Sequence, residues 1–413
     1  MHYTPKAILP KYLWNYVIEY LSLNDLTKTV KVNSTFDILL DANDWKIKFM
    51  DKRKHDIVVI KCRSKRMDNF WIYAWYNYTP CVDFDNIFST IEADNRINAD
   101  IDPSNFIYYK VFVKGGIYNV VSTTYVQYDF NNKSCSIEII GCNNRTIVEF
   151  ATNTVEKIGA YRKIIIPRYF SIKHITFKNN SYIFNRCKYC YDHYSHLIDI
   201  RQPKTNSNII LYNCSFINNE LWDTAMYAIR SITISKCRFT NVDIVLDTVY
   251  ILDIDDSIFN NSLLFMCNMV QIKVNYMITN SIFSNIVPIS WDCTFMRIGG
   301  LYDSSSNIII TNNHMTNANT LCINNSIYAT VIYRSNIISD INSVAGRTTM
   351  ILGSAHTDYE HAFYIFENNT FTNVRNLNNI NPFNAQPLQN TESFARFNNN
   401  IFNNCSEELT NHD

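Results

Sequence analysis

The stretch Ile209-Ile210-Leu211-Tyr212-Asn213-Cys214-Ser215-Phe216-Ile217-Asn218 decides the fold, because degraded copies of it recur to the end of the chain. Each copy can be aligned on its phenylalanine or on the residue that replaces it. These anchor residues are Phe216, Phe239, Phe259, Phe283, Met315, Ile338, Phe371 and Phe402. The steps between them are 23, 20, 24, 32, 23, 33 and 31 residues. A recurring unit of this length predicts a solenoid, in which each repeat packs on its neighbours.

Two columns of mostly apolar residues precede the anchor, seven and five positions before it. The first column is Ile209, Ile232, Leu252, Tyr276, Ile308, Val331, Tyr364 and Ala395, and the second is Leu211, Ile234, Ile254, Ile278, Ile310, Tyr333, Phe366 and Phe397. Residues two apart share one face of a strand. Both columns are therefore expected to point into the core.

Two further columns flank the anchor and carry small or amide side chains. Two positions before it stand Cys214, Cys237, Ser257, Ser281, Asn313, Asn336, Asn369 and Asn400, and two after it stand Asn218, Asn241, Asn261, Asn285, Asn317, Asp340, Asn373 and Asn404. Stacked Asn side chains can hydrogen-bond along the axis, and Asn tolerates the left-handed backbone of a sharp corner. Each unit is thus predicted as strand, tight turn, strand and turn. An imperfect ninth copy is expected at 175–182, anchored on Tyr182.

Composition narrows the class of protein. The 413 residues contain 37 Lys+Arg and 37 Asp+Glu, so no basic excess favours binding to nucleic acid or to an acidic membrane surface. No apolar run reaches about 18 residues, and the start lacks a secretory segment, so we expect a cytoplasmic protein outside the membrane. The 12 Cys are then free thiols. We expect a monomer without a cofactor.

Residues 1–50 predict a small helical unit. Leu9-Pro10 opens a helix, and Asn24 and Asn33 are placed to cap later ones. The segments 20–26 (Tyr-Leu-Ser-Leu-Asn-Asp-Leu) and 32–36 (Val-Asn-Ser-Thr-Phe), followed by a Trp, resemble an F-box. This resemblance implies docking onto a Skp-family adaptor of a cullin-type ubiquitin ligase. The residues expected to bind that adaptor are Leu9, Pro10, Leu13, Leu21, Leu23, Leu26, Val32 and Phe36.

Residues 51–104 are interpreted as a linker followed by an end cap of the solenoid. The charged run 51–55 is interpreted as a solvated linker, and the aromatic run 70–78 as a surface that packs against a neighbouring unit. Asp83 or Asp85 is placed to cap a short helix that covers the first core layer. Residues 406–413 are assigned to a tail.

Residues 105–405 resemble the right-handed parallel β-helix of pectin-lyase-like proteins and of F-box proteins that carry β-helix repeats. The strand ends Gly116-Ile117-Tyr118 and Ile139-Ile140-Gly141 support this resemblance. The predicted fold class is mainly β, with a solenoid preceded by a small all-α F-box-like domain. The combination, with its Asn, Ile and Tyr richness, resembles F-box proteins of giant, mimivirus-like DNA viruses.

Three kinds of candidate site emerge outside the helical unit. Asp253 and Asp255 should point outward from one strand, with Asp256 beside them, as a weak candidate for acid–base chemistry. The Gly-His-Gly and Arg-Ile-Lys motifs of polygalacturonases are absent, and the neighbouring outward positions carry no Arg, Lys or His. The interpretation we favour is a solvated acidic spot.

A second candidate is the segment 187–196, which places four zinc-ligand side chains within ten residues: Cys187, Cys190, His193 and His196. The gap between Cys190 and His193 is tighter than in ordinary zinc fingers, so free side chains are the favoured interpretation.

The third candidate is an apolar stripe six positions before the anchor, formed by Met277, Ile309, Ile332 and Ile365. An exposed stripe of this kind would bind a partner, whereas loops folding back over it would bury it.

The sequence therefore predicts a non-catalytic adaptor that recruits a target protein to a ubiquitin ligase. The first alternative is a carbohydrate-binding or polysaccharide-degrading β-helix protein. The second is a structural or attachment protein of a virion, which would be trimeric.

Overall fold

The computed structural model describes most of the chain from residue 46 to residue 405. The described residues are 46, 49–65, 67, 70–101, 106–120, 126–130, 135–142, 145–150, 162–179, 182–185, 207–217, 224–227, 229–242, 244–285, 294–302, 305–318, 320–327, 329–341, 350–352, 363–374 and 394–405. Nearly all of the helical unit predicted over residues 1–50 therefore lies outside the described part.

Most of the described residues belong to three long sheets. Sheet A has 13 strands, sheet B has 11 and sheet C has 9. In order of stacking, sheet A contains β2 (Thr79–Cys81), β1 (Ile57–Cys62), β3 (Ile107–Val113), β6 (Cys135–Ile140), β9 (Tyr169–Lys173), β12 (Asn208–Tyr212), β15 (Ser231–Ser235), β18 (Ile251–Asp255), β21 (Asn275–Thr279), β24 (Asn307–Thr311), β27 (Thr330–Arg334), β30 (Phe363–Glu367) and β32 (Phe394–Asn398).

The other two sheets run beside it. Sheet B contains β4 (Gly116–Val120), β7 (Thr146–Phe150), β10 (Thr176–Lys178), β13 (Ser215–Ile217), β16 (Arg238–Thr240), β19 (Ile258–Asn260), β22 (Ile282–Ser284), β25 (His314–Ala318), β28 (Ile337–Ile341), β31 (Thr370–Thr372) and β33 (Ile401–Asn403). Sheet C contains β5 (Val126–Asp129), β8 (Arg162–Ile165), β11 (Tyr182–Asn185), β14 (Thr224–Tyr227), β17 (Ile244–Asp247), β20 (Leu264–Ile272), β23 (Thr294–Tyr302), β26 (Thr320–Ile327) and β29 (Met350–Leu352).

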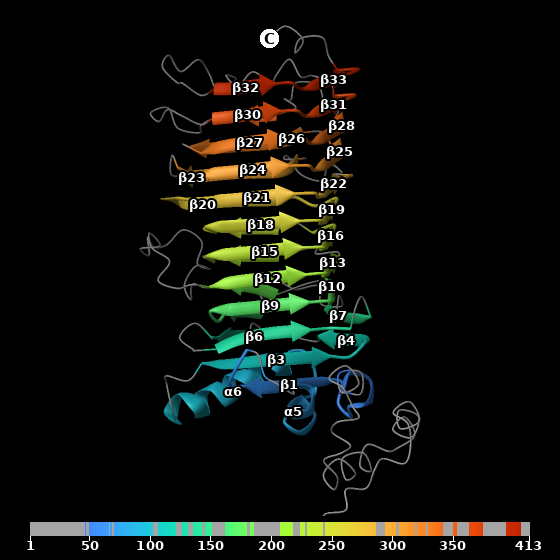
Figure 1. Ribbon diagram of the computed structural model, residues 1–413, viewed down its shortest axis with the longest axis vertical. Coiled ribbons are helices and arrows are strands. Elements are labelled where there is room, and N and C mark those ends of the chain that lie inside the picture. Colours follow the sequence, from blue (N-terminus) through green and yellow to red (C-terminus); the bar gives the residue numbers. More distant parts are fainter. Residues whose placement is uncertain are drawn as a thin grey trace, which may run out of the picture.

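Neighbours within a sheet come from successive coils of the chain, and from β3 onward they pair in parallel. Most coils give one strand to each sheet, and the coils stack along the long axis of the molecule (Figure 1). The prediction of a mainly-β, solenoid-like fold is confirmed. The predicted unit of two strands was incomplete, because it missed the strand in sheet C.

The register of the coils follows the sequence columns. Ile209 pairs with Ile232 and Leu211 with Ile234, and the same alternation continues through every later coil of sheet A. The anchor residues pair from Phe216 to Phe402 in sheet B. Both apolar columns and the anchors therefore point into the core, as predicted.

The ninth copy was placed in the wrong register. Phe177, not Tyr182, pairs with Phe216, and Tyr182 lies in sheet C. Ile175 and Phe177 mimic the two inward strand positions that precede an anchor, which shifted the alignment by five residues. In the correct register the corner position falls on Asn179, whose φ is 54°.

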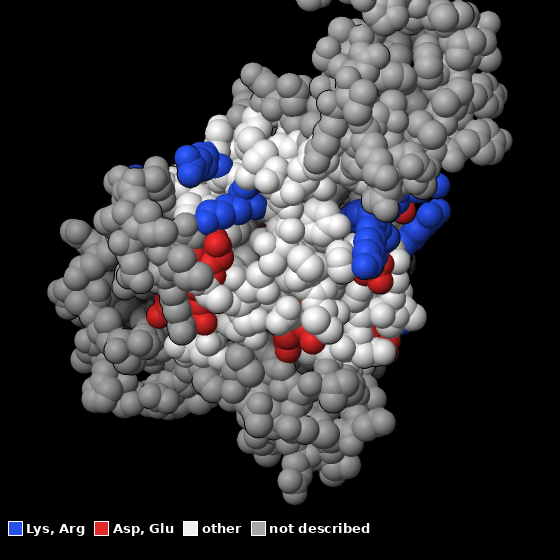
Figure 2. Space-filling view, turned by 90° about the horizontal axis from the view of Figure 1, so that it is seen from below, with Lys and Arg blue, Asp and Glu red and all other residues white. Residues whose placement is uncertain are grey.

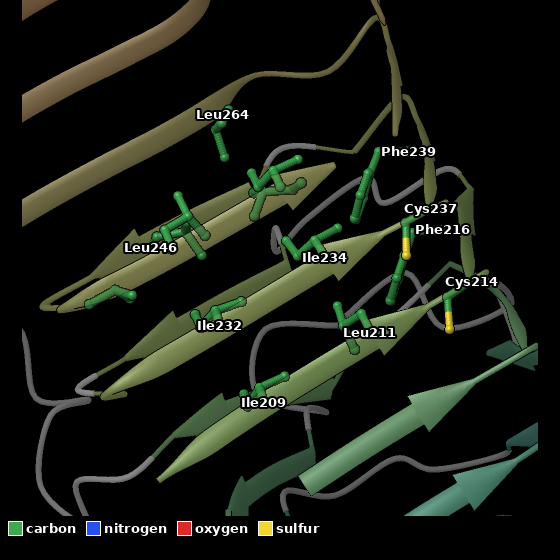
Figure 3. Close-up of a cluster of buried hydrophobic side chains, with 14 of the residues drawn as sticks. Ile209, Leu211, Cys214, Phe216, Ile232, Ile234, Cys237, Phe239, Leu246 and Leu264 are labelled. Atoms are coloured by element: carbon green, nitrogen blue, oxygen red, sulfur yellow. The ribbon is translucent and has the colours of Figure 1, made fainter. Parts of the chain in front are cut away.

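The core is built from like side chains stacked on like. Phe216 and Phe239 stack with ring centroids 5.1 Å apart and planes within 2° of parallel, and Phe259 and Phe283 with centroids 4.5 Å apart. Figure 3 shows the isoleucine and leucine columns of sheet A beside this aromatic stack. The spacing equals the distance of about 4.8 Å between neighbouring strands, so each coil repeats the packing of the last.

Two corners of each coil use left-handed backbone, one between sheets A and B and one after the strand of sheet B, on the way to sheet C. The predicted corner two residues after the anchor has a positive φ in Asn241, Asn261, Asn285, Asn317, Asp340, Asn373 and Asn404. A second left-handed position, three residues before the anchor, was not predicted; it is occupied by Asn213, Lys236, Asp256, Asn280, Asn312, Ser335, Asn368 and Asn399. Asn is enriched at both positions because it tolerates this conformation better than most residues.

A buried amide ladder runs through the last four coils. The backbone N–H of Asn313 donates to Asn336 Oδ1 at 2.9 Å, and that of Asn336 donates to Asn369 Oδ1 at 2.9 Å. Asn336 Nδ2 donates both to Asn369 Oδ1 at 3.0 Å and to the carbonyl of Ile310 at 2.9 Å. Each step repeats the same set of bonds, so the predicted stacking of Asn along the axis is confirmed.

The N-terminal end of the solenoid is covered by helix α6 (Asn86–Ile101) and by the antiparallel strands β1 and β2. Asp83 Oδ1 accepts the backbone N–H of Asn86 at 2.7 Å, which confirms Asp83 as the capping residue. Phe88 and Ile91 of α6 are buried against the first core layer.

Pro80 lies on the edge strand, where its missing N–H discourages further pairing. Seen from below, this end carries interspersed acidic and basic side chains (Figure 2).

Helix α5 (Phe70–Tyr76) covers the outer face of sheet A at the same end. Its residues Phe70 and Trp71 contact Phe112, which points outward from β3, with ring centroids 6.2 and 5.3 Å away. The interpretation of the aromatic run as a packing surface is confirmed.

Candidate binding surface

The residues predicted to dock an adaptor lie outside the described residues. They are Leu9, Pro10, Leu13, Leu21, Leu23, Leu26, Val32 and Phe36. At the end of the predicted helical unit, residues 46 and 49–52 are described and are helical. Phe49 is fully buried between Trp71, Trp75 and Phe112, with ring centroids 5.8, 6.4 and 5.3 Å away.

Arg53 holds this junction together. Its guanidinium donates to the carbonyl oxygens of Phe49 at 3.3 Å, Met50 at 3.0 Å and Asp56 at 3.2 Å. Lys114 Nζ, at the end of β3, donates to the carbonyl of Arg53 at 2.6 Å. The side chain is only 2% exposed, and this burial lowers the pKa of Arg53 to about 10. The interpretation of 51–55 as a solvated linker is therefore wrong at Arg53, because helix-end carbonyls need a donor that water cannot supply there.

The three candidate carboxylates lie on or beside β18. Asp253 and Asp255 point outward, as predicted, whereas Asp256 occupies the left-handed corner with φ 48°. Asp255 Oδ1 accepts from Thr279 Oγ1 at 2.9 Å and from Asn280 Nδ2 at 2.8 Å. Partial burial, and then the charge of Asp255, raise the pKa of Asp253.

The side chains that pair with the two aspartates on the neighbouring strands are uncharged. Thr233 and Ser235 pair with the two aspartates on one side, and Met277 and Thr279 on the other. These are the neighbours that the sequence predicted, and none of them titrates or carries a positive charge. General acid–base catalysis depends on titratable groups placed within reach of the reacting atoms, and at the outward positions of these three paired strands Asp253 and Asp255 are the only ones described.

The apolar stripe is assembled in register. Met277 pairs with Ile309, Ile309 with Ile332, and Ile332 with Ile365. Met277 is 41% exposed, whereas the three isoleucines are half-buried. The accessible apolar surface is therefore concentrated at the Met277 end, next to Asp253.

The proposed zinc ligands Cys187, Cys190, His193 and His196 lie outside the described residues. Within the described part of the chain, no group of three or more His, Cys, Asp or Glu side chains is placed to hold a metal ion.

Sequence reasoning missed an exposed apolar column on the outer face of sheet B. It lies one residue before the anchors and includes Ile282 (40% exposed), Ile337 (52%) and Ile401 (57%). His314 and Thr370 interrupt it. The isoleucines recur in the aligned repeats, so the signal was present in the sequence, but polar residues at the alternate coils concealed it.

Comparisons of the chain with protein-family models, with curated proteins and with solved structures find no match. Among the described residues, no helix is long and apolar enough to cross a membrane.

Proposed function

We propose that this protein is a non-catalytic adaptor of a cullin-type ubiquitin ligase. In this proposal an F-box formed by residues 1–50 binds a Skp-family adaptor. The solenoid, taken as a right-handed parallel β-helix over residues 105–405, presents a rigid face to the target protein. A recruiting adaptor has to hold its target at a defined place relative to the ligase, so the link between its two arms should be stiff.

The observation that carries the proposal is the junction at Phe49 and Arg53. The helical residues 49–52 begin with a fully buried phenylalanine, and the carbonyls of Phe49 and Met50 accept hydrogen bonds from a buried guanidinium. Lys114 then ties Arg53 to the end of β3. A charged side chain is buried only when its hydrogen bonds compensate the cost of desolvation, and here they join the two proposed arms.

The solenoid supports the same conclusion. Its inward columns and corner positions are explained by stacking, because each side chain contacts its equivalent on the next coil. Stacked repeats of this kind form long, stiff surfaces on which partners bind. Asp253 and Asp255, the strongest catalytic candidates among the described residues, have no Lys, Arg or His paired with them on the two neighbouring strands, which favours binding over catalysis.

The experiment is a binding measurement between the purified full chain and a purified Skp-family adaptor. We expect a complex that survives gel filtration, with the free chain eluting as a monomer. A chain lacking residues 1–45 should lose the complex while it keeps Phe49, Arg53 and the circular dichroism of the sheets. Leu9→Asp and Leu23→Asp should weaken the complex in the same way.

Failure of the correctly folded full chain to bind any Skp-family adaptor refutes the proposal. A stable trimer in gel filtration would instead favour a structural protein of a virion. Hydrolysis of a polyuronate that Asp255→Asn abolishes would favour a carbohydrate-active enzyme.

A further inference from the structure

The outer face of sheet A carries an exposed apolar area between β12 and β21. Ile210 is 41% exposed, Ile251 40% and Met277 41%. Asp253 lies among them, paired directly with Met277 on the next coil and two residues from Ile251 on its own strand. We call these four residues the β18 patch. Figure 1 shows this face of sheet A, with α5 at the far N-terminal end.

Single exposed apolar side chains are ordinary, but here the three lie on one face within four successive coils. Coils are spaced by about 4.8 Å, so the patch spans about 14 Å along the axis. This size suits a few side chains of a bound protein segment and is small for a dimer interface.

Asp253 is the one charged residue of the β18 patch. Asp253 has no hydrogen-bond or ion-pair partner among the described residues. Two cations on the strands of sheet A to either side of the patch are already paired: Lys173 Nζ lies 2.8 Å from Glu138, and Arg334 Nε lies 2.8 Å from Glu367. Outward positions between them, on β12 to β24, carry no Lys or Arg.

We infer that the β18 patch binds a protein segment that places a Lys or Arg side chain against Asp253 and apolar side chains against Ile210, Ile251 and Met277. The inference rests on the proposed function, because it names the chemistry of the target that the adaptor recruits. A nucleic acid would be repelled by the two aspartates. A bound cation stabilises the charged form of Asp253, so affinity should fall as the pH drops through the raised pKa of that carboxyl.

The probe is a display library of random 12-residue peptides, selected on the full chain. Selected peptides are expected to share a basic residue flanked by apolar ones. One consensus peptide, labelled with a fluorophore, is then titrated with the full chain and its variants by fluorescence anisotropy. Asp253→Asn should weaken binding about tenfold, and Met277→Lys should weaken it at least as much, since it adds a repelling charge beside the basic residue.

Two variants serve as matched controls. Asp256→Asn removes the same charge three residues away, at a corner where Asn tolerates the left-handed φ of 48°. Ile337→Lys places a lysine on the outer face of sheet B, at a residue that is 52% exposed. Both should bind the consensus peptide as the unmodified chain does.

The inference is overturned if no peptide is enriched, if the enriched peptides lack a basic residue, or if Asp253→Asn binds them as well as Asp256→Asn does. These outcomes are independent of the proposed function. Variants of the β18 patch should still form the complex with the Skp-family adaptor, whereas loss of that complex in the unmodified chain would refute the adaptor and leave the peptide measurement standing.

Discussion

The coils at 207–285 and those at 307–405 solve the same packing problem with different side chains. In the first group the turn position two before the anchor holds Cys or Ser, and four phenylalanines stack at the anchor itself. In the second group the turn position holds the amide ladder, and the next two anchors are Met315 and Ile338. The two groups show that stacking like on like matters more than which residue is stacked.

The second group adds a second aromatic stack. Tyr333 lies in the second inward column of sheet A in the coil anchored on Ile338, and Phe366 and Phe397 follow in the coils anchored on Phe371 and Phe402. Tyr333 and Phe366 stack with centroids 4.9 Å apart, and Phe366 and Phe397 with centroids 4.8 Å apart. Within each column the rings stack on one another from coil to coil, as they do at the anchors of the first group.

The largest loss of stability is expected from Phe239→Ala, in the first group of coils. Phe239 is fully buried between two stacked rings, 5.1 Å from each. The truncation leaves a cavity and should cost about 4 kcal/mol of the free energy of unfolding. Urea unfolding followed by circular dichroism measures it. Phe239→Leu, which fills most of the space, should cost clearly less; equal losses would mean that the missing ring, and not the cavity, sets the cost.

Asn336→Ala tests the ladder in the second group. It removes the acceptor for the backbone N–H and Nδ2 of Asn313, and the donor to the carbonyl of Ile310. Buried unsatisfied groups of this kind cost about 1–3 kcal/mol each, so we expect a loss of about 3 kcal/mol in the same urea experiment. Asn403→Ala, on the exposed face of β33, is the matched control and should change stability by less than about 0.5 kcal/mol.

Ser257→Ala is the counterpart in the first group and should cost less. Ser257 Oγ accepts one buried bond, from the backbone N–H of Cys237 at 3.1 Å, and donates to the carbonyl of Asp255 at 2.9 Å. Losing this smaller set should lower the free energy of unfolding by about 1–2 kcal/mol. A cost equal to that of Asn336→Ala would contradict the view that the amide ladder is the stronger device.

The smallest effect on stability is expected at Asp340, the one carboxylate at the corner two residues after the anchors that the sequence aligned. Asp340 accepts from Asn373 Nδ2 at 2.9 Å, and this bond, with those from Ser339 and Thr316, lowers its pKa. A lowered folded-state pKa gives stability that is present above the unfolded value of about 3.9 and is lost as the pH falls through the folded value. Asp340→Asn should remove this dependence below about pH 4 and change stability little at pH 7. Identical acid unfolding curves for the two proteins would disprove the assignment.

Sequence periodicity predicted the fold well where each coil repeats its neighbour. The inward columns, the anchor stack and the Asn corners were predicted in register from Phe216 to Phe402. The ninth copy failed because Ile175 and Phe177 repeat the same two-residue alternation at a turn. Sheet C was missed because its strands, such as β20 and β23, have variable lengths and lie at variable distances from the anchor.

The candidate surface was only partly predictable. The positions of the apolar stripe that begins at Met277 were predicted from their spacing in the sequence. The exposure of the stripe was not, because it depends on the neighbouring side chains: Met277 is exposed, whereas Ile309 is half-buried. The burial of Arg53 was invisible in a charged pentapeptide, since charge alone indicates solvent. It became buried because α5 and β3 close around the end of the preceding helix.

The sequence by itself determined that the chain coils, which residues stack inside each coil and where Asn turns the corners. These features depend on local alternation and on the intrinsic preferences of single residues. Only the tertiary structure decided that Asp253 forms no ion pair with the described residues while Lys173 and Arg334 are paired, and that Arg53 joins the helical end to the first coil. Such properties belong to neighbours brought together from different coils, and the distance between them along the chain carries no record of their contact.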